Sequence, residues 1–241
     1  YWKSYDSKNK EWFKAQFSLY DFSAIKTTDD EKADFMSRLL KGAVRLNSEF
    51  LSKWNGFDVT TRLEFNNDWG LGSSSTVIHL LAQWADVNPL LLHFEVSDGS
   101  GYDVACAGAE YPISYQLKDD AVNYSEIDFE PAFADKLYFV HLNKKQSSKT
   151  AIDYYYKKAK KRKTLASALT DITESIIECN SLSTFMRLMD EHETRVSEHL
   201  MLQTVKSLHF SDFEGSVKSL GAWGGDFVLA ASKMNESEVN A

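Results

Sequence analysis

The chain has 241 residues, of which 27 are Lys or Arg and 35 are Asp or Glu, so its formal net charge at pH 7 is −8. An acidic chain repels phosphate backbones unless its cations gather on one face, and we therefore expect no nucleic-acid partner. Hydrophobic residues make up 43%, and no stretch approaches the ~20 apolar residues of a membrane span, so we expect no membrane association. The length suits one large domain or two smaller ones.

The two cysteines, Cys106 and Cys179, lie far apart and have no CxxC spacing. This pattern indicates neither a disulfide framework nor a zinc ribbon, and it favours reduced thiols in a cytoplasmic protein. The first residues, YWKSYDSKNKEW, lack the basic start and apolar core of a signal peptide.

Apolar spacing predicts the first regular elements. Residues 35–51 repeat apolar side chains at intervals of three and four, which predicts an amphipathic helix, and Thr28 with Glu31 offers a capping box ahead of it. Residues 59–65 alternate between apolar and polar side chains, which is typical of a half-buried strand.

Beyond a Gly/Ser loop, the pattern alternates between helices and strands. Helical spacing covers residues 77–85, and Asn88-Pro89 predicts the start of a short helix. Residues 136–142 read as a buried strand, and 150–204 as two or three helices. Two further strands are expected, one up to Leu220 and one over 227–231.

Three short clusters contain seven of the 11 glycines: Gly70 and Gly72, Gly99 and Gly101, and Gly221, Gly224 and Gly225. Glycine clusters mark positions where the backbone takes a positive φ or closely approaches another group. We therefore expect the three clusters to contribute to one assembled site.

The first cluster, 70-GLGSSS-75, comes between a predicted strand and a predicted helix. Backbone N–H groups, the helix dipole and three hydroxyls could all point at one anion there, which favours a phosphate site. The Walker pattern is absent because no Gly-Lys-Ser/Thr follows at its spacing. A serine-rich helix cap with a tight turn is the alternative.

The other two clusters have comparable alternatives. In 98-DGSGYDVAC-106, Asp103 could orient or deprotonate a substrate hydroxyl, or it could cap a helix of small residues. In 218-KSLGAWGGD-226, backbone N–H groups could wrap an anion, or the segment could be a hairpin turn.

Together, GLGSSS, GSGYDVACA and GAWGGD resemble the conserved motifs of the GHMP small-molecule kinases, the superfamily of galacto-, homoserine, mevalonate and phosphomevalonate kinases. GSGYDVACA is similar to the segment of the bacterial group named for its Gly-Tyr-Asp-Ile-Ala (GYDIA) motif. The resemblance implies an α+β GHMP kinase fold, with a ribosomal-protein-S5-like part at 1–130 and a ferredoxin-like part at 131–241.

Transferred residue by residue, the resemblance assigns roles to specific positions. Asp103 would be the catalytic residue, and Ser74 would also contact Mg²⁺. The expected ATP and phosphate contacts are Gly70, Leu71, Gly72, Ser73, Ser74 and Ser75. The expected third-motif contacts to substrate or phosphate are Gly221, Ala222, Gly224 and Gly225, and further substrate contacts are Gly101, Tyr102, Ser147 and Ser148.

The implied reaction is phosphoryl transfer from ATP, with Mg²⁺, to a small-molecule alcohol, by a cytoplasmic monomer or homodimer. Mevalonate is the first expected acceptor and phosphomevalonate the second. The alternatives are another GHMP kinase, an inactive nucleotide-binding homologue that keeps the glycine loops, and a diphosphomevalonate decarboxylase.

Some positions depart from the family pattern. Asn67-Asp68-Trp69 replaces the usual proline before the first loop, and Trp223 stands where glycine is usual. Only Glu95 lies near the place of the family's glutamate ligand for Mg²⁺. The family's first motif has no match before Thr28, and its last strand and helix end early, so we expect the chain to cover part of an enzyme.

The remaining polar and sulfur-containing patterns favour structural roles. The basic run at 157–163 is typical of a solvated helix end, and HExxH fails because Val196 takes the place of its second histidine. Tyr154 to Tyr156, and a stripe of Met186, Met189, Leu200 and Met201, are expected in the core or in helix contacts.

Overall fold

The computed structural model describes residues 1–53, 55–118, 121–144, 148–158, 162–221, 223 and 225–239. These residues fall into two compact units. The first unit comprises Tyr1–Asn67 and Leu71–Asp128, and the second comprises Asp68–Gly70 and Phe129–Ala241.

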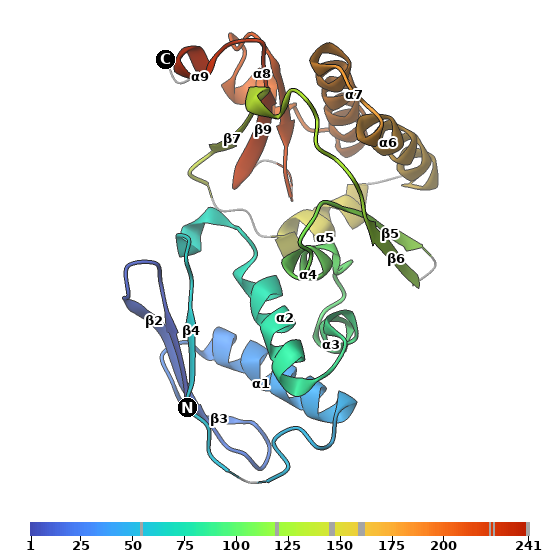
Figure 1. The fold of residues 1–241 in the computed structure, drawn as a ribbon. Coiled ribbons are helices and arrows are strands. Elements are labelled where there is room, and N and C mark those ends of the chain that lie inside the picture. The colour runs from blue at the N-terminus through green and yellow to red at the C-terminus, as the bar shows by residue number, and fades with distance from the viewer. Residues whose placement is uncertain are drawn as a thin grey trace. The chain divides into compact units, whose positions relative to one another are not determined.

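A sheet in the order β3–β2–β1–β4 forms one layer of the first unit (Figure 1). β1 runs antiparallel to β2 and parallel to β4, and β2 runs antiparallel to β3. A separate hairpin joins β5 to β6. The strands are β1 (Trp2–Tyr5), β2 (Glu11–Phe17), β3 (Ala24–Thr27), β4 (Val59–Arg62), β5 (Ile113–Lys118) and β6 (Ala121–Glu126).

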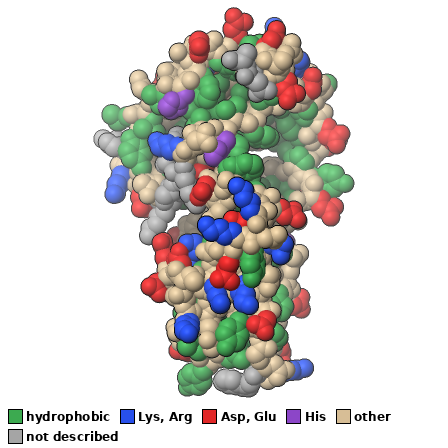
Figure 2. All heavy atoms as spheres, turned by 90° about the vertical axis from the view of Figure 1, so that its left-hand side faces the viewer, with side chains coloured by type: hydrophobic (Ala, Val, Ile, Leu, Met, Phe, Trp, Pro, Cys, Tyr) green, Lys and Arg blue, Asp and Glu red, His purple; other side chains and the backbone are tan. Residues whose placement is uncertain are grey.

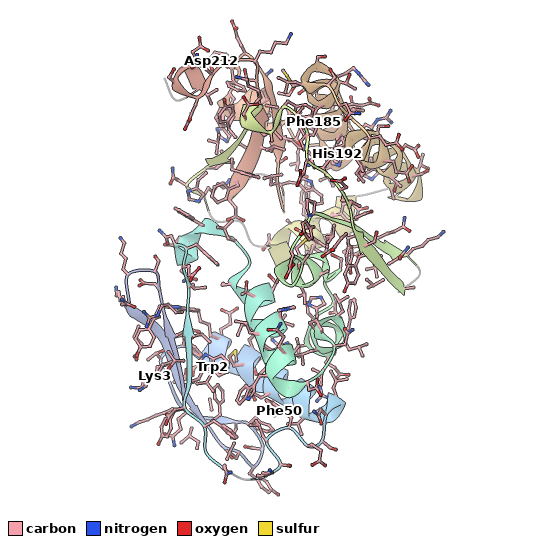
Figure 3. The ribbon with its side chains drawn as sticks, viewed as in Figure 1. Trp2, Lys3, Phe50, Phe185, His192 and Asp212 are labelled. Carbon is pink, nitrogen blue, oxygen red and sulfur yellow. The ribbon has the colours of Figure 1, made fainter. Side chains whose placement is uncertain are left out.

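Helices form the other layer of this unit. α1 packs against β2 and β3, and it also contacts α2 and α3, while α4 packs on α2 and α3. The helices are α1 (Asp30–Leu46), α2 (Ser73–Ala85), α3 (Pro89–Val96) and α4 (Tyr102–Ala107). Figure 3 shows the neighbouring Trp2 and Lys3 on opposite sides of β1, as expected for a strand with one buried face.

The beginning of α1 differs from the expected capping box. Asp29 is the N-cap, and its carboxylate accepts a hydrogen bond from the Lys32 N–H at 3.0 Å. The Thr28 hydroxyl cannot fill that role because it accepts instead from the Lys14 N–H of β2, at 2.9 Å. The helix also ends at Leu46, because Asn47 takes an extended backbone with φ −138° and ψ 99°, so the expected continuation to Leu51 is wrong.

In the second unit, β7 and β8 both pair antiparallel with β9. α7 packs on β8, α5 and α6 pack on α7, and α8 packs on β8. The strands are β7 (Leu137–His141), β8 (Ser216–Ser219) and β9 (Phe227–Ala231). The helices are α5 (Ser148–Lys158), α6 (Arg162–Ile177), α7 (Leu182–Leu200), α8 (Val205–His209) and α9 (Glu236–Val239).

Part of the expected α7 stripe is exposed. Met189 is 1% exposed and Leu200 is fully buried, as the spacing predicts. Met201 is 76% exposed, and its expected place in the core is wrong. The reason is that Met201 forms the left-handed C-cap of α7, with φ 57°, which turns it off the helical stripe.

Two serine hydroxyls connect α7 to β8. Ser216 Oγ donates to Asp190 at 2.8 Å, and Ser219 Oγ donates to Glu193 at 2.6 Å. The other oxygen of Glu193 accepts the Ser219 N–H at 3.2 Å. Asp190 and Glu193 are three residues apart on α7, and Ser216 and Ser219 are three residues apart on β8. The two contacts therefore fix the helix and the strand in one register.

No helix in the described parts of the chain is long and apolar enough to cross a bilayer. On the face of the molecule seen in Figure 2, Lys and Arg side chains are interspersed with Asp and Glu side chains.

His192 of α7 (Figure 3) makes the stability of the fold sensitive to pH. Burial, and to a smaller extent the nearby Lys218 ammonium, together lower the pKa of this imidazole from 6.5 to about 4. In the unfolded chain the ring takes up a proton as the pH falls below its ordinary pKa of 6.5, whereas in the folded chain it stays neutral until the pH approaches 4. We therefore expect the free energy of unfolding to decrease as the pH falls from 6.5 to about 4.

Replacing His192 should make the free energy of unfolding depend less on pH. Urea unfolding at pH 7, 6 and 5 is expected to give a smaller pH dependence for His192→Gln than for the unmodified protein. His209→Gln, which removes an exposed imidazole, is the matched control and should leave the dependence unchanged. The same slope in all three proteins would rule out His192 as the source.

Candidate active site

The expected phosphate loop, residues 70–75, runs into the first turn of α2, and a glycine caps this helix. Gly72 is the N-cap of α2 with φ 75° and ψ 41°, and no side chain caps the helix. The first intrahelical bond runs from the Thr76 N–H to the Gly72 carbonyl at 3.0 Å. The N–H groups of residues 73–75 therefore point outward at the positive end of the helix dipole, as an anion site requires.

The hydroxyls of this loop differ in their availability. Ser75 Oγ and Thr76 Oγ1 both donate to the Gly72 carbonyl, at 2.8 and 2.9 Å. Within the described residues, the hydroxyls of Ser73 and Ser74 have no hydrogen-bond partner. Ser74 is exposed while Ser75 is only 4% exposed, so Ser74 is the better-placed hydroxyl for a ligand.

Gly70, the first glycine of the phosphate loop, packs within the second unit. Its φ is +68°, and a Cβ at this position would overlap the carboxylate of Asp226. The adjacent Trp69 packs against His141 and Phe227, with ring centroids 6.2 Å apart in both pairs. Any residue other than glycine at position 70 would push this carboxylate away.

Asp103 lies in the first turn of α4, which begins at Gly101 with φ 81°. Its side chain is exposed, and its Oδ1 accepts from the Val104 N–H at 3.1 Å. The other carboxylate oxygen has no described partner. Asp103 is therefore accessible to a ligand, and its cap-like bond occupies only one oxygen.

Side chains from other elements hold the turn before Asp103. The ring Nε2 of His93, on α3, bonds to the Gly99 carbonyl at 3.0 Å. Tyr115, on β5, donates its hydroxyl to the Ser100 carbonyl. Sequence reasoning missed both residues, because no local pattern indicates that α3 and the β5–β6 hairpin meet this turn.

Two tyrosines, Tyr102 and Tyr115, lie close enough to Asp103 to feel its charge. Tyr102 lies edge-on to Tyr115 with centroids 6.5 Å apart, and Tyr115 stacks on Tyr124 at 6.2 Å. Burial raises the pKa of Tyr102, of Tyr115 and of Cys106, and the negative charge of Asp103 raises all three pKa values further. These groups thus stay protonated near neutral pH and can donate hydrogen bonds.

The helices that bear the first two motifs pack together in the first unit. α2 contacts α4, and the His79 ring of α2 fills the space beside Gly108, where a Cβ would overlap it. This contact holds the helix that starts at Ser73 against the helix that carries Asp103.

The third glycine segment, residues 220–226, connects the antiparallel strands β8 and β9. Gly221 has φ +59° with open space around it, and Gly225 is buried. Trp223 has a left-handed φ of 54° and stacks on Tyr155 at 5.9 Å. Ala222 and Gly224 lie outside the described residues.

The remaining expected contacts have little described geometry. Ser147 lies outside the described residues, and Ser148 begins α5. Glu95, the residue nearest the place of the family's magnesium ligand, pairs with Arg45 at 2.7 Å. No group of three or more His, Cys, Asp or Glu side chains suited to a metal occurs in the described parts of the chain.

Neither a family model nor a curated protein matches the sequence. Solved structures do match the fold. The Lin0012 protein from Listeria innocua has a TM-score of 0.62 and 17% identity, over 99% of this chain and 80% of that one.

Two further matches are kinases with a small molecule bound. L. major mevalonate kinase in complex with R-mevalonate has a TM-score of 0.57 and 14% identity, over 87% of this chain and 71% of that one. Lactococcus lactis galactokinase complexed with galactose has a TM-score of 0.57 and 12% identity, over 99% and 76%. Both enzymes are GHMP kinases, so the expected α+β GHMP kinase fold is confirmed.

The geometry of Gly101 predicts a specific sensitivity to substitution. An alanine there would place its Cβ 3.0 Å from Leu90 and 3.2 Å from His93, at a φ that side chains rarely adopt. We expect Gly101→Ala to lower the free energy of unfolding by about 1–3 kcal/mol. Gly56→Ala is the control, because no atom lies within 4 Å of its Cβ position. Denaturant titration that gave equal stabilities for the two variants would contradict this account.

Proposed function

We propose that this chain is a small-molecule kinase that phosphorylates an alcohol, with mevalonate as the first acceptor to test. The observation that carries the proposal is the start of α2. There Gly72 caps the helix without a side chain and leaves three backbone N–H groups free to bind an anion. A serine-capped helix would have filled part of that site with its own hydroxyl.

The fold supports the same class of reaction. The solved neighbours include kinases bound to R-mevalonate and to galactose, and both of these ligands carry hydroxyl groups. The sequence also has its three glycine clusters in the order of the GHMP motifs. This combination favours phosphoryl transfer to a small alcohol over simple nucleotide binding.

The phosphate loop fits a nucleotide with Mg²⁺. When bound, ATP supplies the phosphoryl group and Mg²⁺ offsets the charge of its phosphates. Gly70, Leu71 and Gly72 shape the loop, the N–H groups of residues 73–75 bind phosphate oxygens, and the exposed Ser74 hydroxyl contacts the metal. Such a site needs few protein ligands, because Mg²⁺ is commonly held by one or two protein oxygens together with phosphates and water.

In this proposal Asp103 acts on the hydroxyl group of the acceptor. Its exposed carboxylate accepts the hydroxyl proton, or orients that hydroxyl, as phosphoryl transfer begins. Gly101 and Tyr102 line the same turn, and the protonated Tyr102 can donate a hydrogen bond to the acceptor. If the acceptor is phosphomevalonate, its phosphate is already ionised, and Asp103 only orients it.

The other proposed contacts come from the second unit. In this proposal Gly221, Ala222, Gly224 and Gly225 contact substrate or phosphate, as glycine-loop N–H groups commonly do. Ser147 and Ser148 contact the acidic end of the acceptor. These roles follow from the motif resemblance.

The test is ADP release from the full-length protein with Mg²⁺ and ATP, measured for mevalonate, phosphomevalonate, homoserine and galactose against a blank without acceptor. Turnover with one compound supports the kinase and identifies its branch. Nucleotide binding without turnover on any acceptor would contradict the proposal and favour an inactive homologue. Release of CO₂ with diphosphomevalonate would instead indicate a decarboxylase.

Asp103→Asn should lower kcat by ~10²-fold or more while leaving the affinity for ATP nearly unchanged, because the amide cannot accept the proton. Glu110→Gln removes one negative charge from the exposed segment after α4 and is the matched control. Steady-state kinetics on the best acceptor make the comparison. An unchanged kcat for Asp103→Asn would exclude a proton-accepting role.

Ser74→Ala should raise the Mg²⁺ concentration needed for half-maximal activity and weaken nucleotide binding, because one metal-binding oxygen is lost. Ser48→Ala, at an exposed serine of the same unit, should change neither quantity. Titration calorimetry with Mg²⁺ and a non-hydrolysable ATP analogue measures the binding directly. Identical Mg²⁺ dependence in the two variants would remove Ser74 from the metal site.

A further inference from the structure

The second unit contains a cavity of about 520 Å³ that none of the proposed kinase roles uses. Residues from α5, α7, α8 and the end of β8 line it, together with Trp223 of the third glycine segment. Its volume lies within the range of ~300–1,000 Å³ that is typical of small-ligand pockets.

One wall of the cavity is apolar from base to rim. Val196 and Val205 are 5% and 3% exposed, while Leu208 is 52% exposed and Met201 is 76% exposed. Exposed apolar side chains on the rim of a hollow gain free energy when a ligand covers them. This wall therefore favours a ligand with an apolar body.

The aromatic ring of Trp223 also lines the cavity. Trp223 stacks on Tyr155 with an interplanar angle of 25°, and its left-handed backbone is one that a tryptophan rarely takes. Such a conformation persists only where the surroundings hold it, and it often marks a functional position. The Trp223 ring offers a flat surface on which a planar ligand can stack.

The charges around the cavity favour an anion. Glu193 lines it, but its oxygens accept two hydrogen bonds from Ser219, and the ammonium of the partly buried Lys218 lies close by. Lys144 also lines the cavity, is exposed, and forms no ion pair with any described residue. The carboxylate is thus compensated, while this lysine keeps a free positive charge.

We propose that this cavity is a binding site for a small organic anion with an apolar or planar body. The acidic group of the ligand meets Lys144, and its body lies against Leu208 and Trp223. Because Trp223 belongs to the third glycine segment, occupancy of the cavity acts on the loop that we assign to substrate or phosphate.

The test uses the full chain and 1-anilinonaphthalene-8-sulfonate, a fluorescent anion with a planar apolar body. We expect one saturable site under native conditions, and weaker binding of the uncharged N-phenyl-1-naphthylamine. The experiment needs neither nucleotide nor turnover. Failure of every kinase assay would therefore not change the result expected in this binding experiment.

Matched variants locate the site. Leu208→Glu should weaken binding of the anion by at least about tenfold, because a charge replaces part of the apolar wall. Leu91→Glu is the control, since Leu91 is 56% exposed on a helix of the first unit. Circular dichroism and thermal unfolding establish that both variants fold.

The contribution of charge is tested in the same way. Lys144→Gln should weaken binding by about fivefold at low salt, and this loss should shrink as salt screens the pair. Lys233→Gln removes an exposed lysine elsewhere in the second unit and should have no effect. Absence of a saturable site, or equal binding by the cavity variants and their controls, would overturn the proposal.

Discussion

The candidate site in the first unit depends on one backbone constraint, which is the left-handed conformation of the glycines that start α2 and α4. Gly72 and Gly101 have φ values of 75° and 81°, and neither helix receives a side-chain cap. A chiral residue at either position would be strained, and a serine or aspartate cap would occupy the N–H groups itself. Glycine therefore leaves the start of α2 open to an anion.

The same cap has different consequences in the two helices, because their surroundings differ. At α2 the nearby hydroxyls of Ser75 and Thr76 donate back to the Gly72 carbonyl, while the N–H groups of the loop stay available. At α4 the turn is braced from outside, by His93 and Tyr115. A rigid brace suits a group such as Asp103, whose carboxylate must meet a substrate hydroxyl in one orientation.

The sequence predicts those parts of the fold that depend on local periodicity and on glycine. Helical spacing located α1 and α2, and the glycine clusters predicted the turns with positive φ at Gly70, Gly72 and Gly101. It did not predict the β5–β6 hairpin, or that Tyr115 reaches the Asp103 turn, because such contacts join segments without a shared pattern. The cap of α1 was missed for a related reason, since pairing with β2 decides what the Thr28 hydroxyl does, whereas the start of α3 at Asn88-Pro89 was predicted. The roles of the site residues stay predictions.

In the second unit, a buried polar contact links helix position to loop position. Glu193 of α7 binds both the N–H and the hydroxyl of Ser219, the last residue of β8 before the third glycine segment. Breaking one side of such a buried pair would leave a carboxylate unsatisfied, so α7 and the end of β8 are expected to move together. Trp223 lies four residues beyond Ser219 and is held against Tyr155 of α5. The cavity is bounded by these same elements, so a ligand that shifts α5 or α7 must also shift the glycine segment between β8 and β9.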